Sequence, residues 1–238
     1  MDEREGTLGQ RLKTAGFCLY GSLLPEMAHE MGNFLNSINI SCQLMELYQQ
    51  QEGLSQAAPN KIAIISRNID RIEPFLKRML HTRSLAPLLK SKQSGETCFL
   101  YPTLKKLVQT CKQLNRFDRL ELVFAEFPQK QALRVPADLV DFAALVCLVN
   151  LQYFSAVGTI TISCRAAENG TTRVAFELSP ASECRDKYLR LNRQDLHFAG
   201  GYVYVSFDLL QSLLAMYGGS LDVAFDEGER AIFTIKFA

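Results

Sequence analysis

Residues 27–36 of this 238-residue chain read Met-Ala-His-Glu-Met-Gly-Asn-Phe-Leu-Asn. The stretch lies inside a longer pattern, in which apolar or small residues recur at positions 20, 24, 27, 31, 34, 38, 41 and 45. Alternating steps of four and three are the heptad pattern of a helix that buries one side in a bundle. The stretch therefore predicts a long N-terminal helix, around which the remaining elements can be arranged.

His29 is expected nearly opposite this apolar seam, because each helical residue turns the direction by roughly 100°. Asn33 and Asn36, four and seven residues further on, share its face. Imidazole changes its charge near neutral pH, and one ring nitrogen can act as a nucleophile while a neighbour orients the other. The same spacing also suits the ordinary polar side of an amphipathic helix, so it leaves both interpretations open.

The N-terminal part of the chain is predicted to be a helical hairpin. We expect one long helix from about residue 8 to residue 50, bent near Pro25, and a polar connection at residues 52–60. A second helical seam follows at Ile62, Ile65, Ile69, Ile72, Leu76 and Met79. Because a lone hairpin would expose its apolar side, we expect a homodimer in which two hairpins form a four-helix bundle. In the alternative, a monomer, the C-terminal half covers the hairpin.

A polar linker at residues 90–97 is expected to divide the chain into two domains, 1–92 and 93–238. In the second domain we expect helices at 102–115, 136–155 and 203–217, and a loop at 180–200. The expected strands are 120–124, 131–135, 158–167, 172–179, 221–225 and 231–237. The fold class is thus α+β: a helical hairpin followed by an α/β sandwich, in which helices cover one mixed or antiparallel sheet.

Composition restricts the partners and the location. Lys and Arg number 26 and Asp and Glu 25, so the net charge of +1 gives no basic field for nucleic acid or an anionic membrane. The seven cysteines include no Cys-x-x-Cys pair and are expected to be reduced core residues. No apolar run approaches the roughly 18 residues of a membrane span, and the N-terminus lacks a secretory pattern. We therefore expect a soluble, cytoplasmic protein with protein partners.

The other two histidines carry no metal signal. His81 is expected near the end of the second helix and His197 in an exposed loop, where Glu183, Asp186 and Asp195 would be surface charges. Neither histidine has Cys, Asp or Glu at a metal-ligand spacing. The sequence therefore predicts no metal site.

Residues 28–36 resemble the phosphoacceptor box of two-component histidine kinases, which runs His-Glu-x-x-Asn/Thr-Pro-Leu-Asn. The order of helix, second helix, linker and α/β domain also follows that family, so the resemblance covers nearly the whole chain. It implies that His29 is the phosphoacceptor and that Glu30 orients or deprotonates its ring. Asn33 would place a water for receiver dephosphorylation or tune the transfer. Phe34 departs from the family, which usually has proline there.

The nucleotide-binding half departs further from this family. Residues 150–155 read Asn-Leu-Gln-Tyr-Phe-Ser, so Phe154 replaces the asparagine that ligates magnesium in the family. Residues 179–184 lack the adenine-reading Asp and its glycines, and residues 202–206 stand where the glycine-rich phosphate loop is expected. Gly200 and Gly201 lie just before that position. Bulky side chains would block the approach of a backbone to phosphates, so we expect this chain to bind no nucleotide, metal or other cofactor.

The resulting prediction is a dimeric histidine phosphotransferase. His29 would take a phosphoryl group from the phospho-aspartate of one response-regulator receiver domain and pass it to another, with magnesium held by the receiver. Two alternatives stay open. One is a non-catalytic pseudokinase that binds receivers or kinases, and the other is an active sensor histidine kinase with a divergent pocket.

Overall fold

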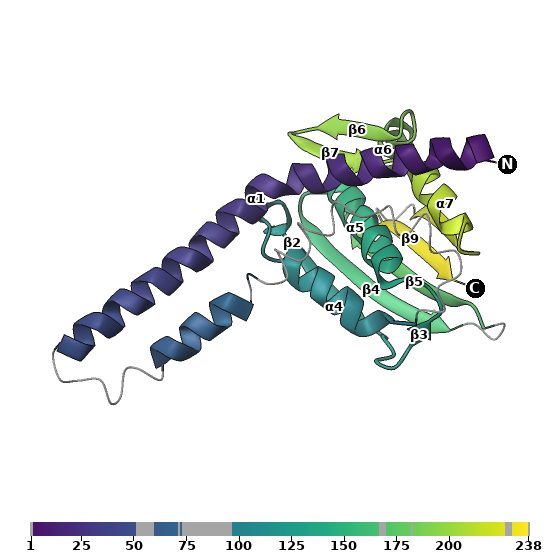
Figure 1. Cartoon of the computed structure of the whole chain (residues 1–238). Helices are drawn as coiled ribbons and strands as arrows, with labels where there is room; N and C mark the ends of the chain where they lie inside the picture. Colours follow the sequence, from purple (N-terminus) through teal and green to yellow (C-terminus); the bar gives the residue numbers. More distant parts are fainter. Residues whose placement is uncertain are drawn as a thin grey trace.

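Five strands form a mixed sheet in the computed structural model (Figure 1). The order is β2-β4-β5-β9-β8, in which β2 and β4 are parallel and the other neighbours antiparallel. The strands are β2 (Leu120–Ala125), β4 (Gly158–Ala166), β5 (Thr172–Ser179), β8 (Ser220–Asp226) and β9 (Arg230–Phe237). Buried residues alternate with partly exposed ones along β4, β5 and β9, so one face of the sheet lies in the core. Of the two predicted alternatives, a mixed or an antiparallel sheet, the structure has the mixed one.

The structure describes residues 2–50, 60–70, 72, 97–166, 170–181, 183–226 and 230–237. The predicted connection at 52–60 lies outside these residues except for Asn60, which is already helical. The seam beyond Ile72, His81 and the domain boundary at residue 92 also lie outside them. So does the predicted linker, apart from residue 97.

Helices α4 (Leu100–Cys111), α5 (Ala137–Phe154) and α7 (Phe207–Ala215) pack on the buried face of the sheet (Figure 1). Before them, β1 (Cys98–Phe99) pairs with β3 (Ala132–Leu133), and a short 3-10 helix, η1 (Asn115–Phe117), follows α4. Within the described residues, α5 alone is long and apolar enough to span a membrane, although the sequence was expected to hold no such run. Because 72% of it is buried inside the domain, it serves here as the core helix.

Helix α1 (Asp2–Gln50) is continuous, and Pro25 lies inside it. Figure 1 shows that α1 changes direction near its middle. Proline removes one backbone hydrogen bond and crowds the preceding turn, which accounts for such a bend. The predicted long helix is therefore confirmed, with a start at residue 2 rather than 8.

The C-terminal half of α1 and residues 60–70 form the helical arm seen in Figure 1. Asn68 is buried between the two helices, and its Nδ2 donates to Ser37 Oγ at 2.9 Å. The predicted pairing of two helices therefore holds over the described length of the second helix. The four-helix bundle that a dimer would form needs a second chain.

The N-terminal half of α1 packs against the α/β domain, where it runs beside β7 (Tyr202–Val205) and α7 (Figure 1). Its buried apolar residues are Leu12, Ala15, Leu19, Tyr20, Leu23 and Met27. The chain's own C-terminal half thus covers the first turns of the apolar seam that was predicted to pack in a bundle. Each large apolar side chain buried in this way contributes about 1.5–3 kcal/mol to folding.

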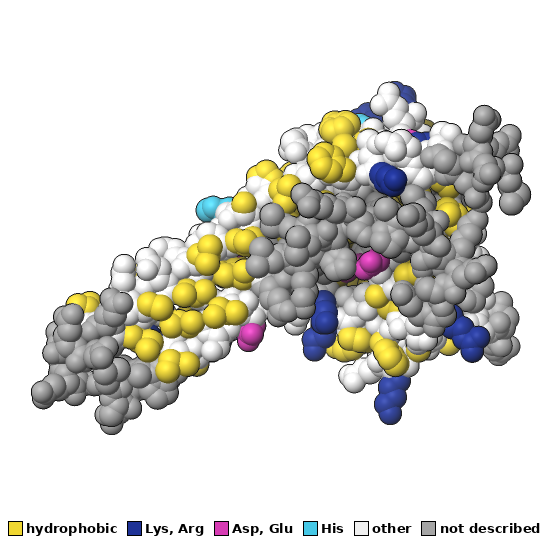
Figure 2. Space-filling model, in the orientation of Figure 1, with side chains coloured by type: hydrophobic (Ala, Val, Ile, Leu, Met, Phe, Trp, Pro, Cys, Tyr) yellow, Lys and Arg dark blue, Asp and Glu magenta, His cyan; other side chains and the backbone are white. Residues whose placement is uncertain are grey.

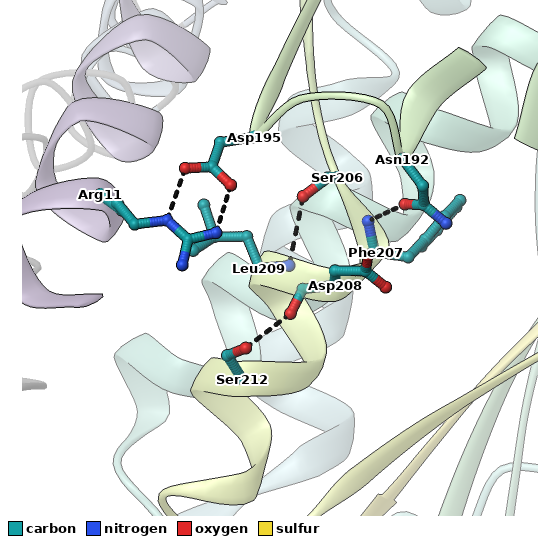
Figure 3. A network of polar contacts seen from close by, with 8 residues as sticks. All are labelled: Arg11, Asn192, Asp195, Ser206, Phe207, Asp208, Leu209 and Ser212. Atoms are coloured by element: carbon teal, nitrogen blue, oxygen red, sulfur yellow. Dashed lines mark hydrogen bonds and ion pairs between the residues drawn. The ribbon is translucent and has the colours of Figure 1, made fainter. Parts of the chain in front are cut away.

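An ion pair fixes the start of α1 to the domain (Figure 3). Arg11 Nε donates to Asp195 Oδ2 at 2.6 Å, and Arg11 Nη2 donates to Asp195 Oδ1 at 2.5 Å. The backbone carbonyl of Asp195 accepts from the Ser206 N–H at 2.9 Å, and Ser206 Oγ caps α7 by accepting from the Leu209 N–H. Asp195 was expected to be a surface charge. Its side chain instead binds Arg11 of α1, and its backbone carbonyl binds Ser206, the N-cap of α7.

The predicted loop at 180–200 and the predicted helix at 203–217 are wrong in part. The structure has a short helix, α6 (Cys184–Leu191), and a hairpin of β6 (Leu196–Ala199) with β7, so α7 begins only at Phe207. Gly200 and Gly201 have φ of 57° and 80°, which are the left-handed conformations of a tight two-residue hairpin turn. The pattern Tyr-Val-Tyr-Val is apolar throughout, so it fitted a helix start as well as a buried strand.

The Arg11–Asp195 pair predicts a pH-dependent contribution to stability. The hydrogen bond from Arg11 lowers the pKa of Asp195, so the pair stabilises the fold above the unfolded-state pKa and loses this effect as the pH falls through the lowered folded pKa. Asp195→Asn should cost about 0.2–1 kcal/mol at pH 6, since both side chains are partly exposed. The difference from wild type should disappear well below about pH 4.

Urea denaturation at several pH values measures this difference, with the exposed Asp186→Asn on α6 as the matched control. A stability difference for Asp195→Asn that stays constant down to pH 2 would contradict the assignment.

Candidate functional site

His29 is exposed on α1, one turn after Pro25. Asn33 and Asn36 are exposed on the same face, while Met27 and Phe34 are buried on the other side of the helix. The outward placement expected from the heptad pattern is what the structure has. Helix α1 therefore presents the imidazole to solvent.

Glu30 and Asn33 contact each other rather than the His29 ring. Asn33 Nδ2 donates to Glu30 Oε1 at 3.3 Å. Adjacent helical residues point roughly 100° apart, so the Glu30 carboxylate does not face the imidazole in this conformation. The role that the family resemblance implies for Glu30 would require the carboxylate to rotate away from Asn33.

Phe154 stands at the position to which the resemblance would assign a magnesium ligand. It is fully buried, stacks on Phe225 with ring centroids 5.6 Å apart, and meets Phe233 edge-on. Lys187 Nζ donates to the Phe154 carbonyl at 3.0 Å. Hydrocarbon occupies the site of an oxygen ligand, so these residues do not fit a bound magnesium ion.

Asn150, the other asparagine of the same motif, has a structural task. It is fully buried, and its Nδ2 donates to the Val205 carbonyl at 2.7 Å. The bond fastens β7 to α5. In the described chain, β7 and the Gly200–Gly201 turn therefore stand where a phosphate-binding loop was sought, and the two glycines serve the hairpin.

An open cavity of about 430 Å³ remains between α5, α6 and the β6–β7 hairpin. It is lined by Gln152, Tyr153, Phe154, Ser155, Ala156, Lys187, Ala199, Gly200, Tyr202 and Tyr204. Tyr153 and Tyr204 pack with ring centroids 4.8 Å apart. Burial raises the pKa of Tyr204. Among the described residues that line this cavity there is no carboxylate, the group that reads the adenine amino group in the family that the sequence resembles.

Arg116 is a functional candidate that the sequence did not indicate. It lies in η1 and is 5% exposed. Its guanidinium carbon lies 4.1 Å from the Tyr202 ring centroid, and Nη2 donates to Gln152 Oε1 at 3.0 Å. Its backbone N–H donates to Glu26 Oε2 at 3.1 Å. Burial lowers the pKa of Arg116. An isolated arginine in a polar turn carries no sequence signal for this arrangement.

His197 lies on β6 and is half-buried, not exposed in a loop as expected. Its ring lies 5.2 Å from that of Tyr153, and burial together with Arg190 lowers its pKa.

Among the described residues, no group of three or more His, Cys, Asp or Glu side chains could hold a metal ion. Of the cysteines, Cys98, Cys111, Cys147 and Cys164 are buried, whereas Cys42 is exposed.

No protein-family model matches the chain, and no curated protein matches it. The solved structures similar to it include the Acinetobacter baumannii histidine kinase AdeS, with 12% identity, 88% of this chain and 97% of that chain covered, and a TM-score of 0.46. A histidine kinase from Burkholderia phymatum STM815 has 12% identity, coverages of 89% and 96%, and a TM-score of 0.48. A bacterial phosphotransferase has 14% identity, coverages of 91% and 95%, and a TM-score of 0.41. The function proposed below rests on this chain's own residues.

Phe154→Ala tests whether this position belongs to the core. The substitution should lower the free energy of unfolding by about 3–5 kcal/mol, because it leaves a cavity between two aromatic rings. Urea denaturation measures the change. Phe198→Ala, at a side chain that is 67% exposed, is the control and should cost less than about 1 kcal/mol. Equal effects of the two variants would show that Phe154 does not carry the core.

Proposed function

We propose that this chain is a histidine phosphotransferase of a two-component phosphorelay. His29 accepts a phosphoryl group from the phospho-aspartate of one receiver domain and donates it to the aspartate of another. The chain itself supplies no nucleotide and no metal, and magnesium is held by the receiver. The proposal places both receiver domains and the transfer reaction in the cytoplasm.

The chemistry needs one nucleophile and correct alignment. A ring nitrogen of His29 attacks the phosphorus, the bond between phosphorus and the aspartyl oxygen breaks, and the aspartate leaves as a carboxylate. The ring nitrogen that does not attack keeps its proton, so the phosphorylated ring carries one positive charge, which balances the negative charge of the departing carboxylate. Transfer to the second receiver reverses these steps, and holding the two groups in line supplies most of the rate enhancement.

One combination of observations carries the proposal. Aromatic side chains fill the position where the resemblance would place a magnesium ligand, and His29, elsewhere in the chain, is exposed. Phe154 is buried between Phe225 and Phe233, so no magnesium ligand remains there. An exposed His29 without a nucleotide of its own must obtain its phosphoryl group elsewhere. A receiver domain carries a phospho-aspartate of sufficient reactivity.

A homodimer is part of this proposal. Figure 2 shows hydrophobic side chains gathered along the helical arm. Large apolar side chains on this arm are about half exposed, namely Leu35, Ile40, Leu47, Ile62 and Ile69. Contiguous apolar surface of this kind favours association, and a second arm would cover it in a four-helix bundle.

A non-catalytic scaffold is the second candidate. It is favoured by the contact between Glu30 and Asn33, which leaves the Glu30 carboxylate turned away from His29. Such a protein would bind receivers or kinases while His29 stays unphosphorylated. A divergent kinase is the third candidate, and it would require ATP in the cavity beside Phe154.

Incubation with a phosphorylated receiver domain separates these functions. Wild type should acquire acid-labile phosphate from the receiver without added ATP, and His29→Ala should acquire none, because the attacking nitrogen is missing. Phosphate on each protein is followed with a radioactive label. His197→Ala, whose ring packs on Tyr153, is the matched histidine control and should accept phosphate.

Label on His29 from ATP alone would favour the kinase. Receiver binding without label, for each of the receivers encoded with the protein, would favour the scaffold.

The homodimer predicts that a charge on the exposed apolar side weakens association. Ile69→Glu should raise the dimer dissociation constant at least tenfold, because the carboxylate would lose its hydration in the bundle. The exposed Arg67→Glu, on the opposite face of the same helix, is the control and should stay dimeric. Light scattering behind size-exclusion chromatography measures the mass, and a monomeric wild type would refute the dimer.

A further inference from the structure

The β6–β7 hairpin and its neighbour η1 hold α1 at two points. At the first, Asp195, directly before β6, bonds to Arg11 (Figure 3). At the second, Arg116 of η1 stacks on Tyr202, the first residue of β7, and its backbone N–H donates to Glu26. Residues 11 and 26 are about 22 Å apart along a helix. A helix held at both points cannot rotate or slide without breaking one contact.

The second contact lies beside His29. Glu26 precedes His29 by three residues, so the two side chains lie on neighbouring positions of one helix face. The α/β domain covers this face at Glu26, whereas Asn33, one turn beyond His29, is exposed. The contact between the α/β domain and Glu26 therefore sets the direction in which the His29 side chain points.

This contact is costly for stability. Arg116 is almost fully buried, yet its Nε and Nη1 have no hydrogen-bond partner among the described residues, and neither has Glu26 Oε1. The bond to Gln152 and the stacking on Tyr202 offset part of the cost of burying the cation. Apolar side chains of similar size would often give equal or greater stability in such a place. The contact between Glu26 and Arg116 thus contributes to the position of α1 rather than to the stability of the fold.

We propose that Glu26 and Arg116 are positioning residues for His29. Through them the α/β domain fixes the rotation of α1, and so presents the imidazole in line with the phosphoryl group of a docked receiver. The proposal rests on the phosphotransfer function of His29. It gives the α/β domain a task that requires no nucleotide.

Two substitutions of Glu26 test this positioning. Glu26→Leu removes the acceptor of the Arg116 N–H and should lower the transfer rate at saturating phosphorylated receiver at least tenfold, with the KM for the receiver changed less than twofold. Glu26→Gln keeps an oxygen acceptor and should restore the rate to within about threefold of wild type. Unchanged rates in Glu26→Leu, or a raised KM with an unchanged rate, would overturn the proposal.

The double variant Glu26→Leu with Arg116→Met covers the case in which the single variant does not fold. It removes both charges at nearly constant volume, so the Arg116 guanidinium is not left without its neighbouring carboxylate, and it should unfold at a higher urea concentration than Glu26→Leu alone. Its transfer rate should still be at least tenfold lower, and a wild-type rate in this stable variant would refute positioning.

A readout independent of phosphate separates this proposal from the phosphotransfer function. Amide hydrogen exchange over residues 22–33 should be at least tenfold faster in the double variant than in wild type, measured by mass spectrometry on the full chain. If wild type accepts no phosphate from any receiver, the phosphotransfer function fails while the exchange result still reports on the contact. Equal exchange in both proteins would show that Glu26 and Arg116 do not hold α1.

Discussion

The packing of the N-terminal half of α1 on the α/β domain is the contact on which the rest of this structure depends. One helix carries two apolar segments: Leu12, Leu19 and Leu23 are buried against the chain's own C-terminal half, whereas Leu35 and Leu47 further along are about half exposed. Pro25 lies between the segments and His29 follows it. His29, the proposed phosphoacceptor, is thus at the point where the helix leaves the domain and becomes the arm.

In the α/β domain, aromatic side chains stand where the resemblance to histidine kinases would place groups that hold a nucleotide. Phe154 belongs to the core together with Phe225 and Phe233, and Asn150 is committed to the β7 backbone. Gly200 and Gly201 make a hairpin turn. These residues do not fit a bound magnesium–phosphate group, and the same domain makes the contacts that hold α1.

The sequence predicted the regular parts of the fold because their signals are local. The heptad seam of α1, the apolar run of α5 and the alternating strands β4 and β5 each bury a face whose period can be read along the chain. The stretch from residue 184 to residue 205 was predicted poorly. Its helix and strands are short, and they are held by distant partners such as Arg11 and Asn150.

The candidate site likewise has features that the sequence predicted and features that it did not. The outward direction of His29 and the loss of the magnesium ligand at Phe154 follow from single positions in recognisable patterns. The contact of Glu26 with Arg116 joins residues 90 positions apart, and neither residue lies in a motif. Such a pair becomes visible only when the chain is folded.

Thermal unfolding of the full chain with and without millimolar Mg-ATP tests most directly whether phosphate must reach His29 from another protein. A ligand present at 100 times its Kd stabilises the folded state by about 2.7 kcal/mol, which raises the melting temperature by several degrees. We predict no change in the melting temperature. A saturable rise, accompanied by transfer of the ATP γ-phosphate to His29, would contradict the proposed source of phosphate.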